Sequence, residues 1–370
     1  MISFIADLEN YTPKNQYSDF IKQYFVDIVK YGTKKYISNI DTHVKILEVN
    51  DTLIPITFWN NKKQQCFTAS VWWMFQYLLL ENRKTKSFFI KHIINLFWLV
   101  MIRIINYSKI YDTIFVNNLM LSTSIYPDLT QKDFSDIIYF LRRKYKNKSI
   151  IFKNINETNH AHIEYLNNLW WLKIVYRQVY LSYSERYDKY KKIKEYKWDA
   201  SRYKKSEYNL KIVRRMDANI SLQMKKCYDN LYIKKYSDMN PNLTKDFFKL
   251  IHKNTYFTLC ALHNKAWEIN GVYSYYNINK QTTAPIIWYK KENLYRHLTH
   301  CYINSVLQNQ TVLNWSSWVW QFKVYRWAEK ATEFFFIFQS YWNIFQAIVW
   351  RTIYIISRYV WEPYFKKNII

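Results

Sequence analysis

The stretch Thr311–Glu333, TVLNWSSWVWQFKVYRWAEKATE, is the part of the chain from which both fold and site can be argued. It begins like a β-strand with Val312 and Leu313 and then turns polar. It contains four tryptophans, at positions 315, 318, 320 and 327. Polar turns usually contain glycine, because only glycine reaches positive φ without steric cost. Tryptophan is a poor residue for such a turn, so this stretch is unusual.

The chain as a whole is short of glycine and rich in tryptophan. Among 370 residues it has 2 Gly and 16 Trp, whereas average usage would give roughly 26 Gly. One hypothesis is that many Trp positions are Gly in the authentic protein. This happens if the host assigns the UGA codon to Gly, as some bacterial lineages do. The alternative is a Trp-rich protein, and the codons of the gene decide between the two.

Length and composition indicate a large folded protein. The length is enough for two ordinary domains or one large one, and half of the residues are apolar, so a sizeable core is expected. The net charge of +26 suggests an anionic partner, such as nucleic acid, a membrane surface or a phosphate-bearing substrate. An AT-rich genome is the alternative explanation, because it raises Lys, Asn, Ile, Tyr and Phe together.

The four cysteines indicate neither a metal cluster nor a disulfide framework. They lie far apart and form no CxxC pair; they are Cys66, Cys227, Cys260 and Cys301. We therefore predict no metal site and expect a reducing cytoplasm. The N-terminal MISFIADLENYTPK carries acidic residues where an export signal would have a basic start and an apolar run.

Apolar periodicity predicts alternating strands and helices, and thus a mixed α and β protein. Strands are expected at 44–49, 55–58, 174–181, 256–261, 272–276 and 286–287, a strand end at 66–70, and a loop at 282–285. Helices are expected over 15–40, 73–106, 128–146, 160–169, 220–235, 244–253 and 293–308. The helix over 15–40 would bury Phe20, Tyr24, Phe25, Ile28 and Val29 on one face. The helix over 128–146 would begin at Thr130, with Asp133 completing the cap.

Two further tracts have alternative interpretations. The apolar tract 334–361 resembles a membrane span, but it includes Gln339, Asn343, Gln346, Arg351 and Arg358. We interpret it as one or two buried helices, so integral membrane insertion is not expected. The basic, tyrosine-rich stretch 183–215 is either a solvated connector or a patch that binds nucleic acid by charge and stacking.

Five blocks of the second half, in order, resemble bacterial acyltransferases of the GNAT superfamily, near its double-domain Fem-like branch. They are YDNLYIKKYSDMNP (228–241), TTAPIIWY (282–289), NLYRHL (293–298), LNWSSWVWQFKVYRW (313–327) and the following Glu333. The fourth block resembles Asn-x-Ser-Ala-Gly-x-x-x-Phe-Lys-x-x-Arg-Gly, with Trp318 and Trp327 where glycine is expected. In the first half, VNNLMLSTSIYP (116–127) and YRQVYL (176–181) also fit, and Trp171 and Trp288 again stand at glycine-like positions.

The resemblance implies a GNAT-like mixed sheet flanked by helices, present as two tandem domains. We expect an N-terminal domain over 1–182, a basic connector over 183–215, and a C-terminal acyltransferase domain over 216–370. In this fold a splayed strand pair admits the pantetheine arm of acyl-CoA, a cosubstrate rather than a bound cofactor. Its pyrophosphate would lie at the helix start Asn293, Leu294, Tyr295 and Arg296.

Chemistry in this fold is direct attack of an amine or hydroxyl on a thioester or ester. The resemblance assigns proton transfer to Glu333 and Tyr295, and carbonyl or acceptor binding to Asn314. Substrate contacts are expected from Asn117, Asn118, Thr282, Thr283, Ser316, Ser317, Lys323 and Arg326. For the asparagines and serines the alternative is that they satisfy turn backbone, and for the two cations and Arg296 that they are solvated charges.

The sequence therefore predicts a cytoplasmic bacterial acyltransferase. Its donor would be acyl-CoA or an aminoacyl-tRNA, and the second would suit the positive charge. Its acceptor would be a small molecule or a cell-envelope precursor. The alternative is a noncatalytic basic protein that binds nucleic acid or an anionic surface. The acyltransferase hypothesis requires residues 314–317 and the helix start at 293–296 to border one cleft.

Overall fold

The computed structural model describes residues 2–58, 66–82, 103–104, 107–169, 171–308, 310–317, 319–340 and 343–363. The first half of the chain alternates short strands with helices. In order these are β1 (Ile2–Phe4), α1 (Gln16–Tyr31), α2 (Thr33–Tyr36), β2 (Val44–Val49), β3 (Thr52–Phe58), α3 (Val71–Asn82), β4 (Thr113–Val116), α5 (Gln131–Lys144), β5 (Ser149–Ile155), α6 (His160–Asn168) and β6 (Leu172–Tyr183).

The second half repeats this alternation. Its elements are α7 (Tyr187–Lys192), α8 (Lys194–Lys204), β7 (Asn209–Ile212), α9 (Ala218–Tyr228) continued by a π-helix η3 (Asp229–Tyr236), α10 (Lys245–Lys253), β8 (Phe257–His263), β9 (Ile269–Ile278), β10 (Gln281–Tyr289), α11 (Leu294–Leu307), β11 (Val312–Asn314), α12 (Trp320–Val324), β12 (Glu329–Phe338) and α13 (Ile344–Ile356), with a π-helical turn η4 (Ser357–Trp361).

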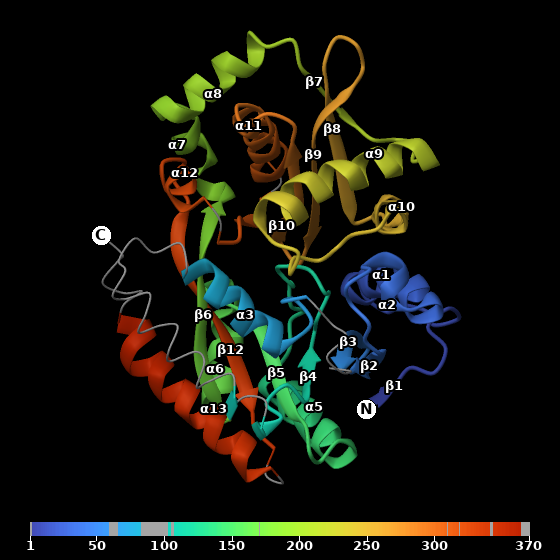
Figure 1. Cartoon of the computed structure of the whole chain (residues 1–370), viewed down its shortest axis with the longest axis vertical. Coiled ribbons are helices and arrows are strands. Elements are labelled where there is room, and N and C mark those ends of the chain that lie inside the picture. The colour runs from blue at the N-terminus through green and yellow to red at the C-terminus, as the bar shows by residue number, and fades with distance from the viewer. Residues whose placement is uncertain are drawn as a thin grey trace.

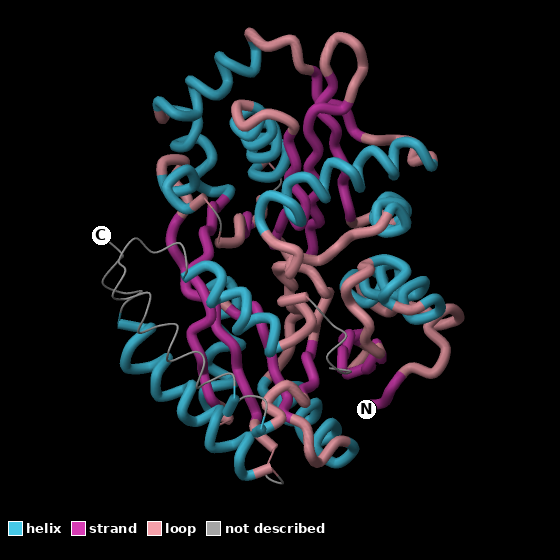
Figure 2. The backbone as a smooth tube through the Cα atoms, viewed as in Figure 1, coloured by secondary structure: helices cyan, strands magenta, loops and turns pink. Residues whose placement is uncertain are grey.

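All twelve of these strands belong to one mixed sheet. Their order is β1-β2-β3-β4-β5-β12-β6-β11-β10-β9-β8-β7. The strands run through the middle of the molecule and the helices lie outside them (Figures 1 and 2). The predicted fold class, a mixed sheet flanked by helices, is confirmed. No helix in the described part of the chain is long and apolar enough to cross a membrane.

β6 joins the two halves of the sheet. One of its edges pairs with β11 and the other with β12, so that Leu181 is opposite both Asn314 and Glu329. β12 also pairs with β5, with Phe336 opposite Phe152. The last strand of the chain thus lies within the sheet of the first half, and α13 packs against β6. Residues 329–338, which the predicted division places in the C-terminal domain, therefore pair with β5 and β6 of the first half.

Several predicted elements need correction. The apolar tract over 334–361 begins as a strand, because β12 extends to Phe338. Its central position in the sheet buries both faces, so the run lacks the polar alternation of an edge strand. Residues 282–285 are not a loop but part of β10, and residues 66–70 form a turn before α3. Of the helices expected over 73–106, α3 accounts for the beginning, and most of the remainder lies outside the described residues.

Other predictions are confirmed. Thr130 and Asp133 form a reciprocal capping box at the start of α5. On α1 the expected apolar face is buried except for Val29, which is 44% exposed. This face packs against the second half of the chain, since the rings of Phe20 and Tyr276 stack at 5.3 Å and those of Tyr24 and Phe257 at 5.8 Å. One apolar core therefore includes residues from both halves.

Candidate functional site

The parallel strands β10 and β11 part at the point where the sequence turns polar. Gln281–Thr283 are in register with Val312–Asn314, and this pairing extends no further along either strand. On its other side, β10 shifts its register with β9 between Thr283 and Ile286. Pro285 lies in this irregularity and has no N–H to donate to either neighbour. The sheet therefore opens between β10 and β11.

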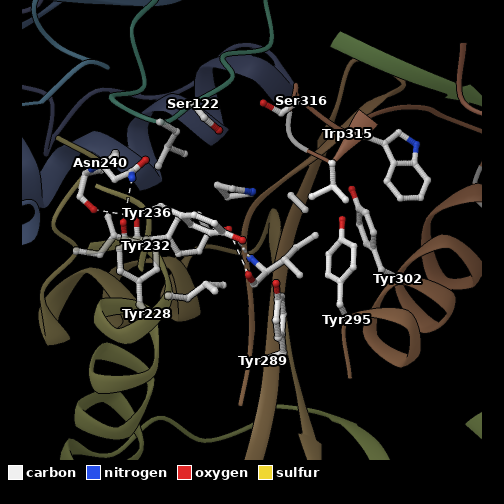
Figure 3. A pocket seen from close by; sticks show the side chains of 18 of the residues that line it. Ser122, Tyr228, Tyr232, Tyr236, Asn240, Tyr289, Tyr295, Tyr302, Trp315 and Ser316 are labelled. Atoms are coloured by element: carbon white, nitrogen blue, oxygen red, sulfur yellow. Dashed lines mark hydrogen bonds between the residues drawn. The ribbon is translucent and has the colours of Figure 1, made fainter. Parts of the chain in front are cut away.

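A cavity of about 120 Å³ lies in this opening. Its walls come from β10, the turn after β11, α12, α11, α9, η3, the loop at 240–243, and three segments of the first half of the chain, at Phe67, Ser122 and Arg177 (Figure 3). Most of the lining is apolar or aromatic, with a few polar groups, which is typical of a small-molecule site. The lining residues that matter below are Ser122, Arg177, Tyr228, Tyr232, Ala284, Tyr295, Tyr302, Trp315, Ser316 and Lys323.

Lys323 is the most unusual group in this lining. It is 3% exposed, and its Nζ donates hydrogen bonds to the carbonyl oxygens of Trp315 at 2.7 Å and Ser316 at 2.9 Å. No carboxylate in the described part of the chain pairs with it. Burial, with a smaller contribution from the charge of Arg177, holds the pKa of Lys323 well below its ordinary value. A neutral amine has two N–H groups and one lone pair. The two N–H groups donate to the two carbonyls, so the lone pair is available to accept a proton.

Arg177 brings a second buried cation to the cavity, but this one is paired. Its Nε lies 2.7 Å from Oε1 of Glu333, which is fully buried. Asn154 donates to the same carboxylate oxygen at 3.0 Å, and the other end of the Arg177 guanidinium donates to the carbonyl of Ser122. Glu333 is not one of the residues that line the cavity. Its role is to fix the position of Arg177, which does line the cavity.

Tyrosine hydroxyls supply the remaining polar groups. Tyr232 is tied to the backbone of Ile287 on β10, and Tyr228 donates to the carbonyl of Pro241. Tyr295 and Tyr302 instead project from α11 toward the turn that contains Ser316 (Figure 3). The Tyr302 hydroxyl is buried without a partner in the described part of the chain. Burial raises the pKa of all four tyrosines, to about 12 for Tyr232, so they stay protonated and can donate.

Three of the predicted site residues meet at this cavity. Tyr295, Ser316 and Lys323 all line it, so the turn at 314–317 and the start of α11 do border one cleft. Asn314 lies just outside, where its side chain accepts from the N–H of Ser316 at 2.8 Å and shapes the turn. Ser316 needs this support, because its φ of +60° is unfavourable for a residue with a side chain.

Two arginines that were predicted to contact the substrates, Arg296 and Arg326, bind a protein carboxylate instead. Both nitrogens on one edge of the Arg326 guanidinium bind Asp199 of α8, one of them at 2.8 Å. Arg296 reaches the other Asp199 oxygen at 3.4 Å and lies over the ring of Trp198. Asp199 thus fastens α8 to α11 and to the turn after α12. At the same helix start, Leu294 is in the core and Asn293 is exposed.

Five other predicted contacts lie away from the cavity. Asn117 accepts from the hydroxyl of Tyr17 and donates to the carbonyl of Ile125, while Asn118 donates to Thr57. Both are fully buried, so the alternative that they satisfy the local fold accounts for their contacts. Thr282 and Thr283 are buried in β10 where it still pairs with β11, and Thr282 donates to Thr311. Ser317, half-buried, also lies outside the lining.

Neither Arg177 nor Tyr302 is predicted from the sequence to be a site residue. Arg177 is one of many cations in a basic chain, and only the pairing of β6 with β12 places it opposite Glu333. Tyr302 looks like a core residue, because it shares the apolar face of α11. Only the structure shows that its hydroxyl has no hydrogen-bond partner among the described residues.

No family model matches the chain, and no curated protein matches it in sequence. Among solved structures, a conserved protein of unknown function from Bacteroides thetaiotaomicron is similar over 91% of this chain and 99% of its own, with a TM-score of 0.52 and 10% identity. FemX is similar over 83% of this chain and 90% of its own, with a TM-score of 0.52 and 6% identity. The L-PGS of Bacillus licheniformis covers 60% of this chain and 78% of its own, at a TM-score of 0.45 and 10% identity.

Identities this low establish the fold and leave the activity open. The first two likenesses extend over most of both chains. The chain therefore has the GNAT-like fold that its sequence blocks indicate.

Proposed function

We propose that the protein is an acyltransferase that moves an acyl group from an acyl-CoA or aminoacyl-tRNA-like donor to an amine or hydroxyl. The observation that supports this most is the position of Lys323. A buried lysine with a lowered pKa lines the cavity between β10 and β11, with two carbonyls fixing its orientation. General bases work best when their pKa lies near the working pH, and desolvation is how a lysine reaches that range.

In the proposed reaction Lys323 moves the proton. The acceptor nitrogen or oxygen attacks the donor carbonyl carbon, and a C–N or C–O bond forms as the donor's C–S or C–O bond breaks. The acceptor's proton passes to the lone pair of Lys323 Nζ and then to the departing thiolate or alkoxide. No oxidant, metal or covalent enzyme intermediate is needed for this balance.

The other polar groups would stabilise the charge that develops on the carbonyl oxygen. Arg177 stays protonated beside Glu333 and directs a positive field into the cavity. The unpartnered hydroxyl of Tyr302, and Tyr295 beside it, can donate hydrogen bonds to that oxygen or to the leaving group. Such preorganised donors are effective because the site needs little reorganisation during reaction. Glu333 is then a positioning residue, and Tyr295 a donor rather than a base.

The charge of the surface near the site supports a polyanionic donor. α7 and α8 expose many cations, and Asp199 fastens α8 to α11 and to the turn after α12. Phosphates of CoA or of an RNA would both be attracted to this surface. The exposed cations of this segment are Lys189, Lys191, Lys192, Lys194, Lys197, Arg202, Lys204 and Lys205. The acceptor, a small molecule or a cell-envelope precursor, would enter the aromatic part of the cavity.

The test compares wild type with Lys323→Met and with a matched surface variant, Lys265→Met. Thiol release from acetyl-CoA and deacylation of mixed aminoacyl-tRNA are measured with a panel of amines. We expect Lys323→Met to lower kcat by about 10²–10⁴-fold, the usual contribution of a general base, and Lys265→Met to have no effect. The rate of wild type should rise with pH through the lowered pKa of Lys323, and the variant should lose this rise.

Two outcomes would contradict the proposal. One is a Lys323→Met protein that is folded and as active as wild type. The other is wild type that consumes neither donor class but binds tRNA. The second result favours the alternative, a noncatalytic basic protein that binds nucleic acid through α7 and α8.

A further inference from the structure

The outward face of α13 is mostly apolar, and Arg351 and Thr352 are the polar residues exposed on it. Ile344, Ile348 and Ile355 follow each other at helical spacing, with Phe345 and Tyr359 beside them. All five side chains are more than half exposed. The opposite face is buried against the sheet through Gln346, Val349, Trp350 and Ile353. Apolar side chains on both faces of a helix are normally covered by other elements, yet the outward face of α13 lies at the edge of the molecule (Figure 1).

The segment before β4 extends this apolar surface. Tyr107 is 76% exposed and packs edge to face against Phe345 at 5.4 Å, and Ile104 nearby is also exposed. Asn343 donates to the carbonyl of Ser108, which fixes the two segments side by side. We call this surface, formed by Ile104, Tyr107, Ile344, Phe345, Ile348 and Ile355, the α13 face. Exposed apolar patches of this kind mark interaction sites.

Cations border the α13 face. Arg351 and Arg358 project along one edge of the helix, and neither forms an ion pair with a carboxylate in the described part of the chain. Between Asn343 and Pro363 the sequence has one acidic residue, Glu362, at the far end. Beyond the N-terminal end of the helix, an open groove of about 280 Å³ is lined by Arg142, Arg143, Lys146 and Lys148.

We propose that the α13 face lies on an anionic membrane surface. Ile344, Phe345, Ile348 and Ile355 would enter the boundary between headgroups and acyl chains, and Arg351 and Arg358 would bind lipid phosphates. An apolar face with basic edges is the pattern of a helix that lies in the plane of the interface. With 13 residues, α13 measures about 20 Å, too short for the roughly 30 Å of hydrocarbon. It would lie on the membrane, not span it.

Charge favours a membrane over a second copy of the chain as the occupant. Two α13 faces in a symmetric contact would bring Arg351 and Arg358 of each copy together, on chains that each carry a net charge of +26. An anionic lipid surface would neutralise the same groups. It would also attract the whole molecule, since each basic side chain near such a surface adds favourable energy.

The test is co-sedimentation of the full chain with vesicles. We expect binding to phosphatidylcholine vesicles that contain about one-third phosphatidylglycerol, and little binding to pure phosphatidylcholine. The double variant Ile344→Glu with Ile348→Glu should lower the partition coefficient at least tenfold, because it places charge where the acyl chains would be. Leu222→Glu, an exposed apolar residue on α9, is the matched control and should bind like wild type.

A second variant and a second measurement separate the outcomes. Arg351→Gln with Arg358→Gln should weaken binding to the anionic vesicles and leave the weak binding to neutral ones unchanged. Equal binding to both vesicle types, or full binding by the isoleucine variant, would overturn the proposal. Light scattering supplies the remaining outcome: a wild-type dimer that Ile344→Glu with Ile348→Glu converts to a monomer would identify the α13 face as a self-interface. Both variants face solvent, and circular dichroism would verify that they fold.

Discussion

At the scale of single residues, Lys153 shows what burial of a charge does. It lies in β5, is 4% exposed, and donates one hydrogen bond, at 2.7 Å, to the carbonyl of Thr68. No carboxylate in the described part of the chain pairs with it, and burial lowers its pKa to about 7. Transferring an unpaired ammonium from water to such a place is costly, so the group loses its proton instead. Lys153 is a cost to stability at low pH.

We therefore predict that stability rises with pH above neutrality. The pKa of Lys153 is lower in the folded than in the unfolded chain, where it is near 10.5. Between about pH 7 and pH 10.5 the unfolded state binds more protons, so the free energy of unfolding increases with pH and decreases as pH falls toward 7. Lys153→Met should reduce this slope, by an amount on the order of a few kcal/mol over the window. Lys323 acts in the same direction, so some slope remains.

Denaturant unfolding at a series of pH values measures this slope. Lys189→Met, an exposed lysine on α7, is the control and should follow the wild-type curve. If Lys153→Met also follows that curve, Lys153 is charged in the folded protein and our account of its burial is wrong.

The residue scale also shows what the sequence could predict of the site. Tyr295, Ser316 and Lys323 could be named because they lie in two short, recognisable blocks. Arg177 could not, since its role depends on the distant Glu333. Arg326 lies in the same block as Lys323 and looked equally suited to bind a substrate. Only the structure shows that Asp199 already occupies it.

At the scale of elements, local signals predicted helices better than strands. The ends of α5 follow from a cap and an apolar face that are both local. β12 could not be distinguished from a helix, because a strand covered on both faces is simply an apolar run. The Thr-Thr-Ala-Pro segment was predicted to be a loop that precedes a short strand. In the structure this segment belongs to β10 and contains a bulge. That bulge is where the cavity opens.

The turn between α12 and β12 tests the tryptophan hypothesis. Trp327 has a φ of +63° and is 45% exposed, so its side chain adds backbone strain and little burial. We predict that Trp327→Gly raises the free energy of unfolding by about 1 kcal/mol, the cost of the left-handed region for a residue with a side chain. Trp267 has a φ of +61° and should respond in the same way. Denaturant unfolding of each purified variant measures the change.

Trp198 provides the contrast. It lies inside α8 with its ring against Arg202 and Arg296. Trp198→Gly should lower the free energy of unfolding by about 1 kcal/mol, because glycine is unfavourable within a helix. Equal destabilisation by Trp327→Gly and Trp198→Gly would mean that the turn does not require glycine. UGA codons at 267 and 327 would support the recoding hypothesis directly.

At the scale of the whole molecule, the two halves are built to fold together. β12 comes last in the chain but lies between β5 and β6, and β6 also pairs with β11 of the second half. On the other side of the sheet's centre, α1 packs its aromatic residues against β8 and β9. The cavity lies where these connections meet, with Arg177 and Ser122 from one half and Lys323 from the other. The site therefore exists only when both halves are folded.

We predict that the described part of the chain unfolds in one cooperative transition. Phe336→Ala, which truncates a fully buried side chain of β12, should lower the free energy of unfolding by about 3–5 kcal/mol. Hydrogen exchange measured by mass spectrometry should then show weaker protection in peptides from β8 to β10 as well as in those from β5 and β6. Phe345→Ala, exposed on α13, should leave both sets unchanged. If only β5 and β6 lose protection, the halves are independent domains, as the sequence-based boundary at residue 182 implies.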